Sequence, residues 1–200
     1  YKAMNASATW NPACANPGGC ELESCKNTLA CRTERPNTLE LFVMSQCPFG
    51  VKALNAMDEV LKNFTTAIDF EVHYIANGTA ATGFNALHGQ PEVDENIRQL
   101  CAAKHFGKNR KYMEYILCRN KDIRSTDWEQ CAKGGMDASV IRRCVDSAEG
   151  KVLLEQSAKV TNALGIGASP TWIANGKHKF SGLDAETIKR NLCEHNKGLK

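Results

Sequence analysis

The sequence predicts an α/β fold with a helical insertion, and three observations lead to that prediction. An apolar run at residues 39–44 leads into a helical pattern at residues 51–61. Residues 68–75 alternate apolar and polar side chains with a period of two, which is typical of a half-buried strand. From about residue 91 to residue 150, apolar residues instead recur at helical spacings.

The first three elements form a strand, helix and strand unit over residues 38–75. Such units place both strands in one sheet with the helix crossing over it, so we expect residues 39–44 and 68–75 to run parallel. His73 falls on the polar face of the second strand. We expect a solvated histidine there rather than a ligand.

The helical segment shows three apolar stripes, and a further helix at residues 151–164 follows it. The stripes begin at Ile97, Leu100 and Cys101, at Met113, Ile116 and Leu117, and at Val140, Ile141 and Cys144. We therefore expect several short helices between the first sheet unit and the last strands.

Pro170 stands at the entry to an apolar strand, before the turn Asn175-Gly176 and a short strand at residues 177–180. A proline cannot donate to a β-ladder, so it needs a special place there. Thioredoxin-fold proteins have such a place, a cis-proline loop that faces the active cysteine and precedes a β-hairpin and a last helix. The chain resembles that fold over most of residues 37–196. Its helical insertion is similar to that of the periplasmic disulfide oxidoreductases, which implies a helical cap beside the active cysteine.

Cys47 is the residue that this resemblance places at the active site, in the motif Cys47-Pro48-Phe49-Gly50. The first helical turn has unpaired N–H groups and a positive dipole end, and both favour thiolate over thiol. A dithiol pair would carry its second cysteine where Gly50 stands, so a resolving thiol has to lie elsewhere. We predict Cys47 as catalytic; the alternative is a small apolar residue packed under the helix. The predicted substrate-binding residues are Pro48, Phe49, Gly50, Ser169, Pro170 and Thr171.

Ten cysteines occur in 200 residues, and none forms a Cys-x-x-Cys pair. Disulfides in an oxidising compartment explain them better than structural zinc, and we predict no metal and no cofactor. Residues 1–36 have few large apolar side chains, so we expect a disulfide-rich appendage to a main domain at residues 37–200. The predicted structural disulfide cysteines are Cys14, Cys20, Cys25, Cys31, Cys101, Cys118, Cys131, Cys144 and Cys193. Cys118 and Cys131 bracket a short loop, Cys101 and Cys144 can join helices, and Cys193 can reach the appendage.

Residues 87–101 resemble the signature of the gamma-interferon-inducible lysosomal thiol reductase family, Cys-Gln-His-Gly-x-x-Glu-Cys-x-x-Asn followed by four residues and Cys. The matching residues are His88, Gly89, Glu92, Asn96 and Cys101, whereas Ala86, Leu87 and Val93 replace the family's Cys, Gln and Cys. Cys118, Cys131, Cys144 and residues 170–177 look like that family's later cysteines and proline loop. The thioredoxin-like region of plant vacuolar sorting receptors is similar in the same places. The resemblance implies thiol reductase activity, but the family's reductases carry two active cysteines.

His88 and Glu92 allow two interpretations. An imidazole and a carboxylate four residues apart share a helix face and could handle protons in thiol exchange. Alternatively, His88 and Gly89 make a turn, and Pro91 with Glu92 begins a helix whose dipole favours an acid. We favour the turn and helix start.

The sequence leaves three functions open. The first is a thiol–disulfide oxidoreductase or isomerase, in which Cys47 forms mixed disulfides with protein or peptide substrates and an external thiol releases them. The second is a non-catalytic thioredoxin-like module that binds a peptide or protein. In the third, an appendage cysteine such as Cys25 or Cys31 resolves Cys47.

Charge and apolar content limit the partners and the compartment. The formal net charge of +3 is small and its basic clusters are short, so we predict no nucleic-acid partner. No apolar run approaches the length that spans a bilayer, so we predict no membrane segment in this chain. The cysteines favour a secreted or lumenal protein, of the secretory pathway, a lysosome-like compartment or the bacterial periplasm. Asn-x-Ser/Thr triplets at Asn5, Asn63 and Asn77 fit a glycoprotein.

Overall fold

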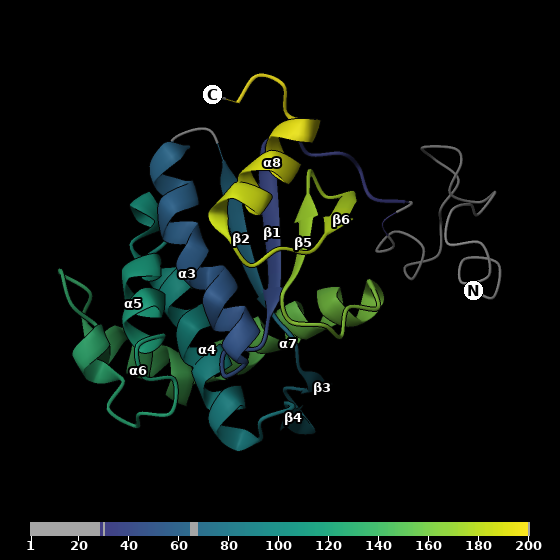
Figure 1. Ribbon diagram of the computed structural model, residues 1–200. Helices are drawn as coiled ribbons and strands as arrows, with labels where there is room; N and C mark the ends of the chain where they lie inside the picture. The colour runs from purple at the N-terminus through teal and green to yellow at the C-terminus, as the bar shows by residue number, and fades with distance from the viewer. Residues whose placement is uncertain (1–28, 30, 65–67, 200) are drawn as a thin grey trace.

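The computed structural model describes residues 29, 31–64 and 68–199 (Figure 1). The predictions for Cys14, Cys20, Cys25 and Asn5 lie outside these residues, as does most of the predicted appendage. Within the described residues, no helix combines the length and the apolar character needed to cross a membrane.

A four-stranded sheet in the order β2-β1-β5-β6 forms the centre of the molecule (Figure 1). The strands are β1 (Thr38–Val43), β2 (Asp69–Tyr74), β5 (Thr171–Ala174) and β6 (His178–Phe180). β1 runs parallel to β2, which confirms the expected strand, helix and strand unit, and antiparallel to β5. The two halves of the sheet therefore come from opposite ends of the described chain.

Helices α3 (Pro48–Asn63) and α8 (Ala185–His195) cover one face of the sheet (Figure 1). Residues of β1 alternate between the two faces, so Leu39, Leu41 and Val43 join the main core with both helices. Phe42 faces the other side, in a smaller cluster with Ile173 and the end of the helix that precedes β5. Burial on both faces makes β1 the central strand of the fold.

The predicted helical insertion is present between the two halves of the fold. It consists of α4 (Gln90–His105), α5 (Tyr112–Arg119), α6 (Ala138–Asp146) and α7 (Ala148–Ala163), with 3-10 turns at Lys108–Arg110 and Glu129–Cys131. Two disulfides fasten it: Cys101–Cys144 joins α4 to α6, and Cys118–Cys131 closes the loop after α5. Both pairings agree with the sequence-based expectation.

A small hairpin of β3 (Asn77–Thr79) and β4 (Gly83–Asn85) connects β2 to α4, and the sequence analysis did not predict it. Its glycines explain the tight geometry. Gly78 has a φ of +112°, and a Cβ there would lie 2.0 Å from the carbonyl oxygen of Gly83. Only glycine fits such a position.

The expectation of a solvated His73 is wrong. The His73 ring stacks on Phe42, and its Nε2 lies 3.4 Å from a carboxylate oxygen of the buried Glu40 and 3.5 Å from one of Glu71. Burial, the largest single influence, lowers the pKa of His73, but the nearby carboxylates of Glu40 and Glu71 raise it overall. The polar alternation of β2 therefore marks a buried charge network, not a solvated face.

Candidate active site around Cys47

Cys47 is the N-cap residue of α3, immediately after the loop that leaves β1. Its backbone N–H donates to the Met44 carbonyl at 3.1 Å, and Pro48 begins the helix. The side chain is partly exposed and the thiol is free. A reachable thiol thus lies at the end of a helix where unpaired N–H groups and the dipole favour negative charge.

The loop before β5 lies directly against this cysteine. The Ser169–Pro170 peptide bond is cis, and the Cys47 thiol donates to the Ser169 carbonyl oxygen, with a sulfur to oxygen distance of 3.7 Å. The Ser169 hydroxyl accepts from the Met44 backbone N–H at 2.9 Å. Two segments more than 120 residues apart are thereby brought together, as the resemblance implied.

Thr171 takes a different place from the other predicted substrate-binding residues. It is buried in β5 at the register position opposite Phe42, and its hydroxyl donates to the Ala168 carbonyl at 2.8 Å. Its side chain supports the loop from within, which argues against a direct contact with substrate.

Gly50 leaves no room for a side chain. A Cβ at this position would lie 2.7 Å from the Ser169 hydroxyl oxygen and 2.9 Å from the Met44 carbonyl oxygen. The second of these contacts is with the backbone, so a rotamer change cannot relieve it. The position where a dithiol pair would carry its second cysteine therefore has no room for a side chain.

Two large apolar side chains of the described chain are more than half exposed to solvent, and one of them lies two residues from the thiol. Phe49, two residues after Cys47, is 60% exposed, and Leu87, beside His88, is 75% exposed. Pro48 is exposed as well. Exposed apolar groups of this size beside a reactive group are common at sites that bind other chains.

The signature residues of α4 contact the loop that precedes Cys47. Glu92 is fully buried, and its Oε1 accepts from the Gln46 backbone N–H and from the His88 ring Nδ1, both at 2.9 Å. Asn96 Oδ1 accepts from the Ser45 backbone N–H at 3.3 Å. Gly89, with a φ of +81°, is the N-cap residue of α4, so the predicted turn and helix start is confirmed. The contact of Glu92 with the loop was not predicted.

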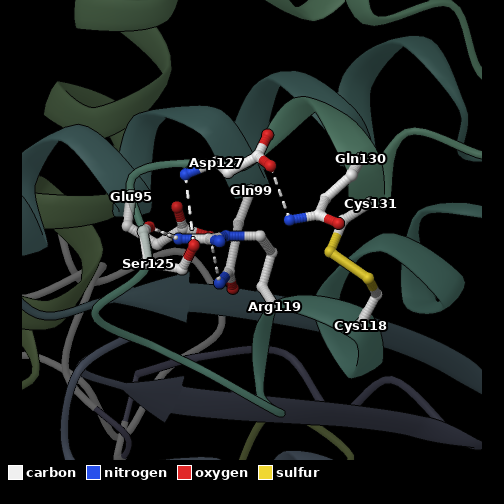
Figure 2. Close-up of a disulfide and its surroundings, with 8 residues drawn as sticks. All are labelled: Glu95, Gln99, Cys118, Arg119, Ser125, Asp127, Gln130 and Cys131. Carbon is white, nitrogen blue, oxygen red and sulfur yellow. Dashed lines mark hydrogen bonds and ion pairs between the residues drawn. A yellow bond between two sulfur atoms is a disulfide. The ribbon is translucent and has the colours of Figure 1, made fainter.

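The next buried carboxylate of α4, Glu95, faces a different loop (Figure 2). It accepts from Arg119 Nε at 3.1 Å, and Arg119 donates to the Ser125 carbonyl at 2.8 Å. The Cys118–Cys131 disulfide closes this loop (Figure 2). Through the Gln46 side chain, which donates to the Ile123 carbonyl, the same loop also touches the Cys47 site.

Cys193 differs from its prediction as a disulfide cysteine. It is a free thiol in α8 that packs, partly buried, against the main core. The sequence pattern showed a cysteine in a final helix, but not that the helix turns it toward apolar neighbours. Cys31 is in a disulfide, as predicted.

Two groups of side chains in the described part of the chain are compact enough to suggest a cation site, and both have other partners. One combines Glu40, Glu71 and His73, whose carboxylates already pair with arginines. The other includes Cys144, which is held in a disulfide with Cys101. Neither donor set favours a metal.

Solved structures share this architecture. Oxidised BdbD from Bacillus subtilis matches with 15% sequence identity and a TM-score of 0.61, over 80% of this chain and 88% of that chain. The thiol-disulfide exchange protein α-DsbA2 from Wolbachia pipientis matches with 15% identity and a TM-score of 0.60, over 82% and 83%. DsbA from Chlamydia trachomatis matches with 14% identity and a TM-score of 0.58, over 80% and 86%. The protein therefore has a DsbA-like thioredoxin fold with a helical insertion.

Within that class, the chain resembles the gamma interferon inducible lysosomal thiol reductase family. The family model matches residues 38–135, which include Cys47 and the signature residues of α4 but end before the Ser169–Pro170 loop. No curated protein sequence matches the chain at a significant level. The family match supports thiol–disulfide oxidoreductase activity as the general class of chemistry.

Proposed function

We propose that the protein catalyses thiol–disulfide exchange on protein or peptide substrates through Cys47 alone. The observation that carries this proposal is a partly exposed thiol at the start of α3, against the Ser169–Pro170 loop, beside a Gly50 position closed to a second thiol. A site of this kind can form a mixed disulfide but has no cysteine at the usual position to resolve it.

The exchange has two steps. The Cys47 thiolate attacks one sulfur of a substrate disulfide, which forms a bond between Cys47 and that sulfur and releases the other sulfur as a thiolate. An external thiolate then attacks the substrate sulfur of the mixed disulfide. A new disulfide forms between the external thiol and the substrate, and Cys47 is released as a thiolate. When the attacking thiolate belongs to the substrate itself, the outcome is isomerisation; when it is a small thiol in excess, further exchange completes reduction.

The surroundings of Cys47 support a polypeptide substrate. Pro48 and Phe49 are exposed beside the thiol, and the partly exposed Ser169 and Pro170 border it from the other segment. An extended chain placed here can pair with loop backbone groups while an apolar side chain covers Phe49. Ser169, Pro170, Pro48 and Phe49 are therefore the proposed substrate-contacting residues, with Gly50 allowing close approach of the two segments.

An oxidising compartment, secreted or lumenal, is the proposed location. The Cys101–Cys144 and Cys118–Cys131 disulfides persist only where thiols are not kept reduced. Asn63 and Asn77 are exposed at element ends, where a glycan can be carried.

The test uses the other free thiol as a matched control. Purified wild-type protein, Cys47→Ala and Cys193→Ala are assayed for reduction of a peptide mixed disulfide by excess small thiol. We expect Cys47→Ala to fall to the uncatalysed rate and Cys193→Ala to keep wild-type activity. Trapping the peptide on Cys47, identified by mass spectrometry, distinguishes exchange from non-covalent binding.

A non-catalytic binding module is the second candidate, and the exposed Phe49 beside Cys47 favours it. This function predicts a peptide complex that survives Cys47→Ala with unchanged affinity and shows no turnover in the wild type. Full activity in Cys47→Ala contradicts the exchange proposal directly.

A further inference from the structure

We propose that Glu92 is a positioning residue for Cys47, acting with His88 and Asn96 to hold the loop that presents the thiol. The inference rests on the proposed function only in assigning a purpose to that thiol. In physical terms, the buried Glu92 carboxylate on α4 controls how fast Cys47, at the N-cap of α3, reacts.

The loop between β1 and Cys47 is held by side chains from elsewhere in the molecule. Three successive backbone N–H groups, those of Met44, Ser45 and Gln46, donate to the side chains of Ser169, Asn96 and Glu92, respectively. Each of these acceptors is a side-chain oxygen rather than a backbone carbonyl. The path of the chain into Cys47 is therefore fixed by three side-chain oxygens, two of them from α4.

Glu92 is the strongest of these acceptors on physical grounds. The residue is 0% exposed, and a buried carboxylate is costly unless several donors satisfy it. Its donors are the Gln46 backbone N–H, the His88 backbone N–H at 3.1 Å and the His88 ring at 2.9 Å. The Gln46 N–H is thus one of the few donors that make the burial of the Glu92 carboxylate possible. A charged acceptor also holds this N–H more tightly than a neutral acceptor does.

The Gln46 N–H lies one residue before the thiol. Cys47 has extended backbone angles at the N-cap of α3, and its N–H turns back to the Met44 carbonyl. A shift of the preceding peptide therefore moves the thiol relative to both the helix end and the Ser169 carbonyl. Loss of Glu92 is expected to slow thiolate chemistry through this displacement.

A charge effect predicts the opposite sign. A carboxylate close to a thiol disfavours the thiolate, so removing the charge of Glu92 without moving the loop speeds the reaction of Cys47. The direction of the change therefore separates positioning from simple electrostatics.

The experiment measures the rate at which iodoacetamide labels Cys47 in the full-length protein, mapped by mass spectrometry at one pH and well below the unfolding midpoint. We expect the order wild type, Glu92→Gln, Glu92→Ala, with the alanine variant slower by about tenfold, short of the ~100-fold that a 1 Å misplacement can cost. The glutamine keeps an acceptor for the Gln46 N–H, so it rescues part of the rate. Unchanged or faster labelling in Glu92→Ala overturns the proposal.

Glu95→Gln is the matched control, since Glu95 is also buried on α4 but contacts Arg119 rather than the Cys47 loop. We expect it to lower the melting temperature while leaving the labelling rate of Cys47 unchanged. An equal slowing in this variant means a general structural effect and contradicts the proposal.

His88→Ala keeps the test open if Glu92→Ala does not fold, because the His88 side chain is 32% exposed and its removal leaves Glu92 short of one donor. A labelling rate below that of the wild type is expected, and a wild-type rate contradicts the proposal that Glu92 positions Cys47. The labelling comparison needs no turnover, so it stays decisive even if the wild type fails the exchange assay and the proposed function with it.

Discussion

The loop before Cys47 and the loop after Cys118 are both irregular segments fastened to α4, and they are fastened by different bonds. The first is held by hydrogen bonds to Glu92 and Asn96, without a disulfide. The second is held by the Cys118–Cys131 disulfide and by the ion pair of Arg119 with Glu95 (Figure 2). A structural disulfide beside a reactive thiol would itself exchange with that thiol, whereas a carboxylate cannot.

This difference explains how the loop before Cys47 can stay in place although two of the family's signature cysteines are missing from this chain. Ala86 and Val93 stand at those positions, next to the residues that contact the Cys47 loop. Val93 is buried in the main core instead. The neighbourhood of the thiol is thus fixed by polar contacts and packing, and the two disulfides of the insertion lie farther along the chain.

The largest effect is expected from Arg119→Leu, which removes the more buried of the two arginines that pair with the buried Glu95, the other being Arg98. Arg119 and Glu95 side chains are 3% and 2% exposed, and breaking such a pair costs about 3–5 kcal/mol. We expect urea unfolding to register that loss while the labelling rate of Cys47 in the folded protein stays within a factor of about two. A strong loss of Cys47 reactivity shows instead that the two regions are coupled.

Removing the Cys118–Cys131 disulfide is the next test. The two cysteines are 13 residues apart, and a loop of that length predicts a stabilisation of about 3 kcal/mol. The double variant Cys118→Ala/Cys131→Ala is expected to lose that amount in denaturant unfolding under non-reducing conditions. Removal of Cys101 and Cys144, 43 residues apart, should cost more, about 4 kcal/mol, because a longer loop restricts the unfolded chain more. A larger loss from removal of Cys118–Cys131 than from removal of Cys101–Cys144 contradicts this explanation.

A smaller loss, about 1–3 kcal/mol, is expected from Gly50→Ala, because the added methyl group meets the Ser169 hydroxyl and the Met44 carbonyl. Gly167→Ala is the matched control, since a Cβ there meets nothing within 4 Å, and we expect a change below about 0.5 kcal/mol. Denaturant unfolding measures the free energy of unfolding of both variants. Equal values for the two contradict the crowding at Gly50.

The smallest effect is expected from pH, through His73 on the opposite face of the sheet. Its pKa is raised in the folded protein: burial, the largest influence, lowers it, but the attraction of the Glu40 and Glu71 carboxylates outweighs burial. The stabilisation is complete below the ordinary value of about 6.5 and is lost as the pH rises through the folded pKa.

The free energy of unfolding of the wild type should therefore decline above about pH 6.5 more steeply than that of His73→Gln. Glu71 behaves in the opposite way. His73, the largest influence, and Arg35 lower its pKa to about 2 although burial raises it, so its contribution is lost only as the pH falls below about 4.5. Parallel curves for the two proteins from pH 6 to 9 contradict the assignment to His73.

The sequence was sufficient for the parts of the fold that have strong local signals. The alternation at residues 68–75, the apolar run before Cys47 and the proline before β5 each have a physical meaning that a single sequence reveals. The pairing of Cys118 with Cys131 followed from their short separation. These features depend on near neighbours in the chain.

What the sequence did not reveal depends on contacts between distant segments. Nothing local to His73 indicates that Arg32 and Arg35 bury Glu40 beside it. Nothing near Glu92 indicates that its carboxylate reaches the Gln46 backbone, 46 residues earlier. Cys193 looked like a disulfide cysteine because composition alone made disulfides the expected state of every cysteine except Cys47.

The closed position at Gly50 also restricts the order in which this site can change. A chain that gained cysteine at residue 50 first would pass through a strained intermediate, because the Ser169 hydroxyl and the Met44 carbonyl already occupy the space. A smaller residue at 169 and a displaced Met44 carbonyl have to come before the thiol. The gain of a second cysteine beside Cys47 is therefore a multi-step path with an epistatic barrier, and a single-substitution screen for dithiol activity should find no such variant at residue 50.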